Sequence, residues 1–466
     1  MNQKGTRKFE LPDTIVILIG MILIATCMTW FVPSGMYDRI EDPLTQRMVV
    51  DPASFHYIDQ TPVGLWDMLL AVPDGIVASA NIIVLTLISG AAFHIINQTG
   101  AIDAGLGTAM KKLQGGKVYI MLFGIMALGA LLGLRGSAES LLPFIPLGVA
   151  AAMAMGFDSI TGVALMLVGG IGGYSVSFID SAFIIGQGIA GLPAFSGIPF
   201  RMAAFAALTL PCAGYLYLYC RRLQRDPKSS SMYEADKNLK LTVDSAATPE
   251  LTGRRKAVLL IFCGSFVVLF YGIFKLNFNV RKITAMYFAL AVIAGVAGGF
   301  SMNEFAKHFV DGAKSMMYGV LAVGLARVIS EVLTNGNILD TITYTAAGVV
   351  GKVPGWASAS GMFVVQMLLN ILIPSGSGQA AVTMPIMAPL ADLVGVTRQT
   401  AVLAFQMGDS ITNFISPTVG YFMAAIAIGN IPWLKWAKWV TPLLLFLALE
   451  CCVILSIATM IGYGPF

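Results

Sequence analysis

Runs of about 20 apolar residues, the length that an α-helix needs to cross a bilayer, recur along the whole chain. They are separated by polar stretches, of which residues 34–75 form an acidic loop expected on the external side. The pattern predicts membrane-spanning helices over residues 14–33, 76–96, 201–220, 257–275, 283–300, 317–334 and 440–462. We therefore expect an all-α polytopic membrane protein.

Two stretches beside these helices are too polar to span but keep a helical period. Residues 97–117 place Ile102 and Met110 on one face with Lys111 beside them, and residues 336–350 begin with a similar Gly-Asn-Ile-Leu-Asp sequence. We predict an interfacial helix in each stretch.

Glycine, proline and polar residues interrupt two regions that are otherwise as apolar as a membrane helix. Residues 134–147 are LRGSAESLLPFIPL, and residues 373–389 are IPSGSGQAAVTMPIMAP. Broken backbone in a bilayer is tolerated only where protein or a water-filled cavity satisfies its amides and carbonyls. Because the apolar arms beside the first break are short for a span, we predict re-entrant hairpins over 118–155 and, by the same pattern, over 357–394.

Two longer apolar regions, 160–190 and 398–428, are interrupted near their middles by glycines and by hydroxyl or carboxylate residues. They predict helices that unwind within the membrane. Such interruptions in corresponding positions of two halves are the best sequence indication of a transporter binding site.

The same order of elements occurs twice, in residues 1–220 and 257–466, and the polar residues 221–256 form a cytoplasmic linker between the two halves. The extra helix at 257–275 reverses the orientation of the second half, so we predict an inverted-topology repeat. Lys4, Arg7 and Lys8 precede the first helix, which places the N-terminus in the cytoplasm by the positive-inside rule. The predicted helices then leave the C-terminus outside.

Composition supports a membrane protein, because 57% of the residues are hydrophobic and 12% are charged. A soluble domain carries about a quarter charged residues. The net charge of +4 sits mostly in loops and indicates topology, not a nucleic-acid partner. The six cysteines show neither a disulfide framework nor a zinc motif.

Nothing in the sequence indicates an enzyme or a bound organic cofactor. There is no Walker motif, which removes a built-in ATPase. His56, His94 and His308 are expected to lie far apart in the predicted topology, which argues against a metal cluster or a catalytic base.

The ends of both hairpins and both broken helices are expected to converge near the membrane midplane. Half-helix N-termini offer free amides to a carboxylate, and the opposite ends offer carbonyls to a cation. The candidate substrate-binding residues at these breaks are Arg135, Ser137, Glu139, Asp180, Ser377, Gln379 and Asn413. The candidates for coupling to Na⁺ or H⁺ are Ser137, Glu139, Ser177, Ser375, Ser377, Asp409, Thr412 and Ser416.

Each candidate also has a structural reading. Small polar residues can let helices pack closely or can bond to their own turns. A carboxylate at membrane depth costs at least ~2.5 kcal/mol, so Glu139, Asp180 and Asp409 are functional candidates by default, although each could instead cap a broken helix. We expect Arg135 to face a substrate carboxylate and Arg327 to pair with a glutamate one turn later.

Three segments resemble a known family: LPDTIVILIGMILIATCMTWFVPSGMYDR near the N-terminus, IGQGIAGLPAFSG in the first half, and SGSGQAAVTMPIMAPLADLVGVTRQTAVLAFQMGDSITNFISPT in the second. They are similar to the YfcC-like branch of the C4-dicarboxylate anaerobic carrier (DcuC) family, in the ion transporter superfamily. The resemblance implies a scaffold domain, a transport domain with two hairpins, an elevator-like movement and a homodimer. Its branches are assigned to C4-dicarboxylates or to basic amino acid exchange.

We therefore expect a secondary active transporter of a small charged metabolite in a bacterial cytoplasmic (inner) membrane. Three carboxylates against one substrate-facing arginine favour a basic or zwitterionic amino acid, carried by exchange or by ion coupling. The alternatives are a C4-dicarboxylate carrier coupled to Na⁺ or H⁺ and, third, an ion channel. The expected partners are the substrate, the lipid bilayer and a second copy of the chain.

Overall fold

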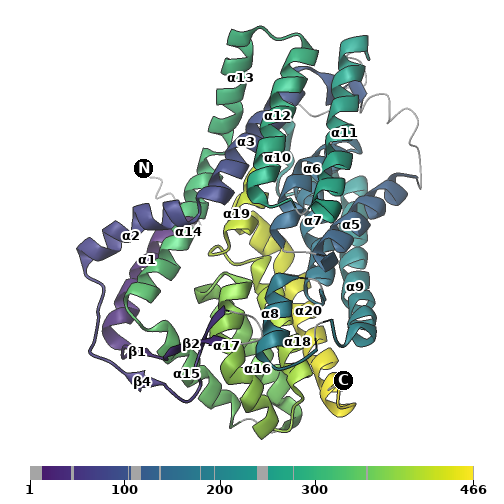
Figure 1. Cartoon of the computed structure of the whole chain (residues 1–466). Coiled ribbons are helices and arrows are strands. Elements are labelled where there is room, and N and C mark those ends of the chain that lie inside the picture. Colours follow the sequence, from purple (N-terminus) through teal and green to yellow (C-terminus); the bar gives the residue numbers. More distant parts are fainter. Residues whose placement is uncertain are drawn as a thin grey trace, which may run out of the picture.

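The computed structural model describes residues 13–42, 47–102, 104–105, 117–135, 138–178, 180–193, 195–238, 250–276, 278–352 and 355–464. Most of these residues lie in helices, which run mostly along one long axis of the molecule (Figure 1). The helices of the first half are α1 (Thr14–Phe31), α2 (Leu65–Ala78), α3 (Ala80–Gln98), α5 (Lys117–Arg135), η1 (Ala138–Phe144), α6 (Ile145–Ala154), α7 (Ser159–Tyr174), α8 (Ser181–Ile189), α9 (Ile198–Arg225), η2 (Pro227–Ser229) and α10 (Tyr233–Asn238).

The second half is also built from helices. Its helices are α11 (Gly253–Lys275), α12 (Val280–Gly298), α13 (Met302–Ser315), α14 (Met317–Asn335), α15 (Leu339–Val350), α16 (Gly355–Leu372), α17 (Gly376–Leu393), α18 (Arg398–Asn413), α19 (Gly420–Ile428) and α20 (Trp433–Met460).

Seven helices in the described part of the chain are long and apolar enough to cross a membrane. They are α1, α3, α9, α11, α12, α14 and α20. Six of them are less than half buried in the isolated chain, as expected for helices that face lipid. The helix α14 is mostly buried, and α7 and α18 are buried along almost their whole length. This confirms the mostly helical, multi-span architecture.

The described residues between 34 and 79 form strands and a helix where the sequence predicted a polar loop over 34–75. Gly35–Met36 pairs with His56–Tyr57, and Arg39–Asp42 pairs with Arg47–Val50, both antiparallel. The helix α2 follows and packs on α14, so the expected helix at 76–96 begins only at Ala80. Hydrophobic periodicity missed α2 because Asp67, Pro73 and Asp74 interrupt its apolar run in the sequence.

The chain before α14 holds a further helix that the prediction at 317–334 lacked. Ser301 caps α13 and Glu304 bonds back to the Ser301 amide, a capping box that starts the helix. Because α13 folds along α3, the rings of His94 and His308 lie 6.0 Å apart, centroid to centroid. The expectation that the three histidines lie far apart is therefore wrong for this pair.

Both long helices that close the halves exceed their predicted ranges. The helix α9 was expected over 201–220 but continues to Arg225, and α20 was expected over 440–462 but begins at Trp433. The length of an apolar run indicates only the part of a helix that lies inside the bilayer. Both helices are longer because residues that favour the membrane interface, arginine in α9 and tryptophan in α20, continue them beyond the apolar run. The linker expected at 221–256 therefore starts later and includes α10, while residues 239–249 lie outside the described residues.

The described part of the linker packs against the start of α7. The Asp158 carboxylate caps α7 by accepting from the Thr161 amide at 2.9 Å, and it also accepts from the Tyr219 hydroxyl at 2.5 Å and the Ser230 hydroxyl at 2.6 Å. The Asp236 carboxylate accepts from the Ser159 amide at 2.9 Å. These bonds join α9, the linker and the broken helix α7–α8.

We expect Asp158→Ala to lower the free energy of unfolding by about 1–3 kcal/mol, because it leaves several buried donors without an acceptor. The measurement is the thermal midpoint of the detergent-solubilised protein. Glu234→Gln, an exposed carboxylate on α10, is the matched control and should leave the midpoint unchanged. Equal midpoints for wild type and Asp158→Ala would show that the linker contact does not stabilise the fold.

Candidate functional site

A cavity of about 440 Å³ lies where several helices begin or end. Its lining includes Glu139 of η1, Tyr174 and Asp180 at the break between α7 and α8, and residues 374–377 at the start of α17. Thr418 and Gly420 come from the start of α19. Further lining residues come from α2–α3 and α14, and they include Ser79, Ile82, Val323 and Arg327.

The hairpin formed by α16 and α17 contributes Gly376, at the start of α17, to the cavity lining. A Cβ atom on Gly376 would lie 3.1 Å from the Ala182 Cβ, 3.2 Å from the Tyr174 hydroxyl and 3.3 Å from an Asp409 carboxylate oxygen. The start of α17 therefore packs directly on the start of α8. A larger residue cannot make this approach without displacing its neighbours.

Asp409 lies directly behind Gly376 and is 1% exposed. Its carboxylate accepts a hydrogen bond from the Tyr174 hydroxyl at 2.6 Å and another from the Asn370 side-chain amide. Neither donor is charged. A buried carboxylate held only by neutral donors keeps its affinity for a cation or a proton.

A chain of amides supports the second hairpin from within. The Gln379 amide donates to the Gln366 side-chain oxygen at 2.7 Å, while the Gln379 oxygen accepts from Asn370 at 3.0 Å. Gln366 donates in turn to the Thr383 hydroxyl at 3.0 Å. Gln379 was expected to contact substrate, but its side chain is fully buried in this network, one layer below the cavity.

Side chains satisfy the broken backbone between α7 and α8. The Gln406 amide donates to the carbonyls of Tyr174 and Ser177, at 3.0 and 2.8 Å. The Arg201 guanidinium, fully buried over the Phe183 ring, donates to the Ser177 carbonyl at 3.2 Å and to the Gln406 side-chain oxygen. These carbonyls are therefore already occupied by protein donors and are not free for a cation.

Asp180 and Ser177 hold the same break by their side chains. The Asp180 carboxylate caps α8, accepting from the Ala182 amide at 2.8 Å, and it also lines the cavity. The Ser177 hydroxyl donates to the Leu134 carbonyl at 2.7 Å, which ties the break to the end of α5. Asp180 therefore caps a broken helix, which was the structural role considered for it, and its side chain also lines the cavity.

Tryptophans satisfy the corresponding break between α18 and α19. The indole of Trp436 donates to the Phe414 carbonyl at 2.9 Å, and that of Trp433 donates to the Ile415 carbonyl at 2.8 Å. The Thr412 hydroxyl bonds to the Gly408 carbonyl of its own helix at 3.1 Å. The Ser416 hydroxyl pairs with that of Thr418 at 2.7 Å.

Two helix starts at the cavity keep unsatisfied amides. No described residue accepts a hydrogen bond from the backbone amides of Gly376 and Ser377 in α17, or from those of Gly420 and Tyr421 in α19. A helix start carries a partial positive charge, so these amides are suited to an anionic group.

The structure brings four of the predicted site residues together around the cavity: Glu139, Asp180, Ser375 and Ser377. Asp409 lies just behind it. Ser177, Thr412, Asn413 and Ser416 lie in the two breaks but are absent from the cavity lining in the described part of the chain. Ser137 falls outside the described residues, and of Arg135 only the backbone, at the end of α5, is described.

Arg327 makes the expected pair with Glu331, at 3.0 Å between Nε and a carboxylate oxygen. It also lines the cavity, which sequence reasoning did not predict. Reasoning from the sequence also missed Tyr174, Asn370 and Arg201. Asn370 and Arg201 are polar residues inside apolar segments, and this pattern alone would have justified including them.

A polar cavity among broken helices in a multi-span protein is typical of a membrane transport protein. Comparison with known families identifies the family to which this chain belongs. The family described as C4-dicarboxylate anaerobic carrier (DcuC) matches residues 11–461, and the chain belongs to this family.

Two relatives match this chain over nearly their full lengths. The Escherichia coli (strain K12) protein named "Putative basic amino acid antiporter YfcC" is 29% identical over 99% of this chain and 98% of its own. A Haemophilus influenzae (strain ATCC 51907 / DSM 11121 / KW20 / Rd) protein named "Uncharacterized protein" is 27% identical over 95% of both chains. The expected resemblance to the YfcC-like proteins of the DcuC family is thus confirmed.

Two solved structures of transport proteins are distantly similar. The YdaH transporter of Alcanivorax borkumensis covers 97% of this chain and all of its own, with 18% identity and a TM-score of 0.41. MtrF of Neisseria gonorrhoeae covers 96% of this chain and 95% of its own, with 17% identity and a TM-score of 0.42.

We expect Gly376→Ala to reduce transport by about tenfold or more while the protein remains folded. The added methyl meets Ala182, Tyr174 and Asp409 at 3.1–3.3 Å, so the starts of α17 and α8 must separate by a few tenths of an ångström, and a small misplacement at a binding site is costly. The measurement is initial uptake in proteoliposomes at matched protein content. Gly348→Ala, on a helical glycine with open space around it, is the control. Wild-type uptake by Gly376→Ala would show that close packing of the two helix starts is not needed.

Proposed function

We propose that this protein is a secondary active transporter of a basic or zwitterionic amino acid across the bacterial inner membrane, working by exchange or by ion coupling. The observation that carries the proposal is the cavity that combines Glu139 and Asp180 with the free amides at the starts of α17 and α19. One set of groups suits a cation and the other suits a carboxylate.

The charged groups of the cavity favour a substrate that carries both a positive and a negative group. Among the described residues, Arg327 is the arginine in the cavity lining, and Glu331 already pairs with its positive charge. Asp180 is engaged by the start of α8, which leaves Glu139 as the carboxylate that can face a substrate ammonium or guanidinium group. The substrate carboxylate then lies at the helix starts of α17 and α19. The name of the Escherichia coli relative is in keeping with this assignment.

A C4-dicarboxylate is the alternative substrate. Two helix starts could each hold one carboxylate group, and Arg327 would then balance the excess negative charge. The name of the family also points to this class. An ion channel is the third reading, and two hairpins that do not span the membrane suit alternating access better than a continuous pore.

Proteoliposomes separate these substrates. With arginine or lysine inside, we expect uptake of labelled arginine, lysine or ornithine by exchange, and no comparable uptake of succinate or malate. Succinate or malate uptake without basic amino acid exchange would overturn the proposal in favour of the C4-dicarboxylate carrier. Large single-pore currents would favour the channel.

We expect Glu139→Gln to reduce basic amino acid exchange by about tenfold or more, because the amide keeps the shape of the side chain and removes its charge. Glu234→Gln makes the same change on the exposed face of α10 and should exchange normally. The readout is exchange as a function of substrate concentration. Unaltered exchange by Glu139→Gln would remove this residue from the site.

Asp409 is proposed as the coupling group for Na⁺ or H⁺. The side-chain oxygens of Asn370 and Asn413 have no hydrogen-bond partner among the described residues, and both asparagines are buried near this carboxylate. A carboxylate with neutral amide oxygens is a donor set that suits a hard cation. Ser177 and Thr412 are engaged by backbone carbonyls, so they contribute to the shape of the breaks.

We expect Asp409→Asn to abolish the acceleration of uptake by an inward Na⁺ or H⁺ gradient. Exchange at equal ion concentrations on both sides should persist, because the cavity itself is unchanged. The measurement compares the two conditions in the same proteoliposomes. Gradient-driven uptake that matches wild type would exclude Asp409 as the coupling group.

We further propose that the halves are inverted repeats and that transport follows an elevator-like movement in a homodimer. The cavity supports this division, because its lining includes residues from both sets of helices. The broken helices and hairpins, α5–α8 and α16–α19, would form the moving domain. The helices α1–α3 and α11–α14 would form the scaffold, with the N-terminus in the cytoplasm and the C-terminus outside.

A further inference from the structure

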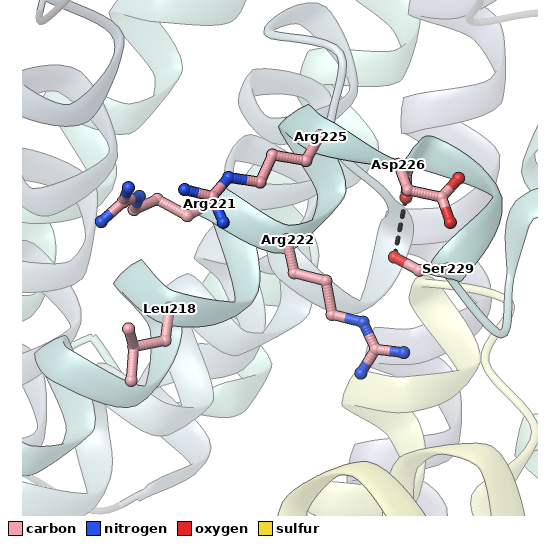
Figure 2. A pocket seen from close by; sticks show the side chains of 6 residues that line it. All are labelled: Leu218, Arg221, Arg222, Arg225, Asp226 and Ser229. Atoms are coloured by element: carbon pink, nitrogen blue, oxygen red, sulfur yellow. Dashed lines mark hydrogen bonds between the residues drawn. The ribbon is translucent and has the colours of Figure 1, made fainter.

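A second cavity, of about 330 Å³, lies at the end of α9, away from the candidate transport site. It is lined by Leu218, Arg221, Arg222, Arg225, Asp226 and Ser229 (Figure 2). Nothing in the transport proposal uses these residues. Three arginines against one aspartate give the lining a net charge of +2.

The positive charge of this cavity is not neutralised within the described part of the chain. Arg221, Arg222 and Arg225 take part in none of the ion pairs between described residues. The carboxylate of Asp226 is directed to its own turn, where it accepts from the Lys228 amide at 3.1 Å. The Ser229 hydroxyl donates to the Asp226 backbone carbonyl at 2.7 Å, the bond drawn in Figure 2.

Helical spacing places Arg221 and Arg225 on the face of α9 that also carries Leu218. Figure 2 shows these two arginine side chains extending to the same side of the helix, whereas Arg222 extends to another. Their guanidinium groups can therefore act together on one anion. Planar guanidinium groups bind phosphate through paired hydrogen bonds.

The same face continues into the membrane as an apolar strip. Leu218 is 65% exposed and Leu210 is 71% exposed, on a helix that is long and apolar enough to span a bilayer. The Arg221 guanidinium lies 5.9 Å from the centre of the Tyr217 ring. Tyrosine and arginine at the end of a spanning helix mark the level of the lipid headgroups.

Arginines at the end of α9 would also complement the helix dipole and help to set topology, without binding anything. That role requires neither a cavity nor an adjoining exposed leucine strip. A soluble phosphate would use the arginines but not the strip. A phospholipid would use both, with its phosphate at the arginines and its acyl chains along Leu218 and Leu210.

We propose that this cavity binds the headgroup phosphate of an anionic phospholipid, with Arg221 and Arg225 as its main contacts. Basic pockets at the membrane surface beside spanning helices are suited to such headgroups. The site adjoins the linker that packs on the start of α7, so a bound lipid would stabilise the end of α9 and this junction.

The test uses the purified full-length protein in a neutral detergent. Short-chain phosphatidylglycerol, short-chain phosphatidylcholine and inorganic phosphate are titrated separately, and the thermal midpoint is recorded. The variants are Arg221→Gln/Arg225→Gln and the control pair Arg254→Gln/Lys256→Gln, which removes equal charge from exposed positions at the start of α11. Arg221→Lys/Arg225→Lys keeps the charge and removes the guanidinium geometry.

We expect phosphatidylglycerol to raise the midpoint of wild type and of the control pair by about 3 °C or more, through binding to the folded state. The glutamine pair should need about tenfold more lipid for the same shift, and the lysine pair should fall between. An equal response of wild type and the glutamine pair would overturn the site. Inorganic phosphate as effective as phosphatidylglycerol would overturn the assignment to a lipid.

Discussion

Broken backbone inside a membrane has to find hydrogen-bond partners within the protein, and this constraint shapes the centre of the molecule. The carbonyls at the break between α7 and α8 receive bonds from Gln406 and Arg201. Those at the break between α18 and α19 receive bonds from Trp433 and Trp436. Side chains from other helices therefore stabilise both unwound stretches, and neither break can be understood from its own sequence.

The candidate site consists of the polar groups that this internal bonding leaves over. The carbonyl ends of the broken helices are largely occupied, whereas the amides at the starts of α17 and α19 remain available beside the cavity. Glu139 and Asp180 add negative charge to the lining, and Asp409 adds more behind it. An anionic group and a cationic group of one small molecule can thus be held a short distance apart.

Much of the architecture followed from hydrophobic length and from glycine and proline. These features indicate the spanning helices and the interruptions, because the bilayer imposes both on the chain locally. They fail for α2 and α13, whose stability comes from packing on α14 and α3. They also place Gln379 at the site, although its amide is directed inward to Gln366 and Asn370. Side-chain direction within a break depends on neighbours that the local pattern does not specify.

The sequence by itself determined that the chain is a multi-span membrane protein of the DcuC family, with polar interruptions in both halves. Local composition is sufficient to indicate the spans and the interruptions, and short motifs are sufficient to indicate the family. The tertiary structure alone decided which polar residues face the cavity and which satisfy backbone. That division depends on contacts such as Tyr174 with Asp409, between residues 235 positions apart. Long-range pairing of this kind leaves no periodic signal in a single sequence.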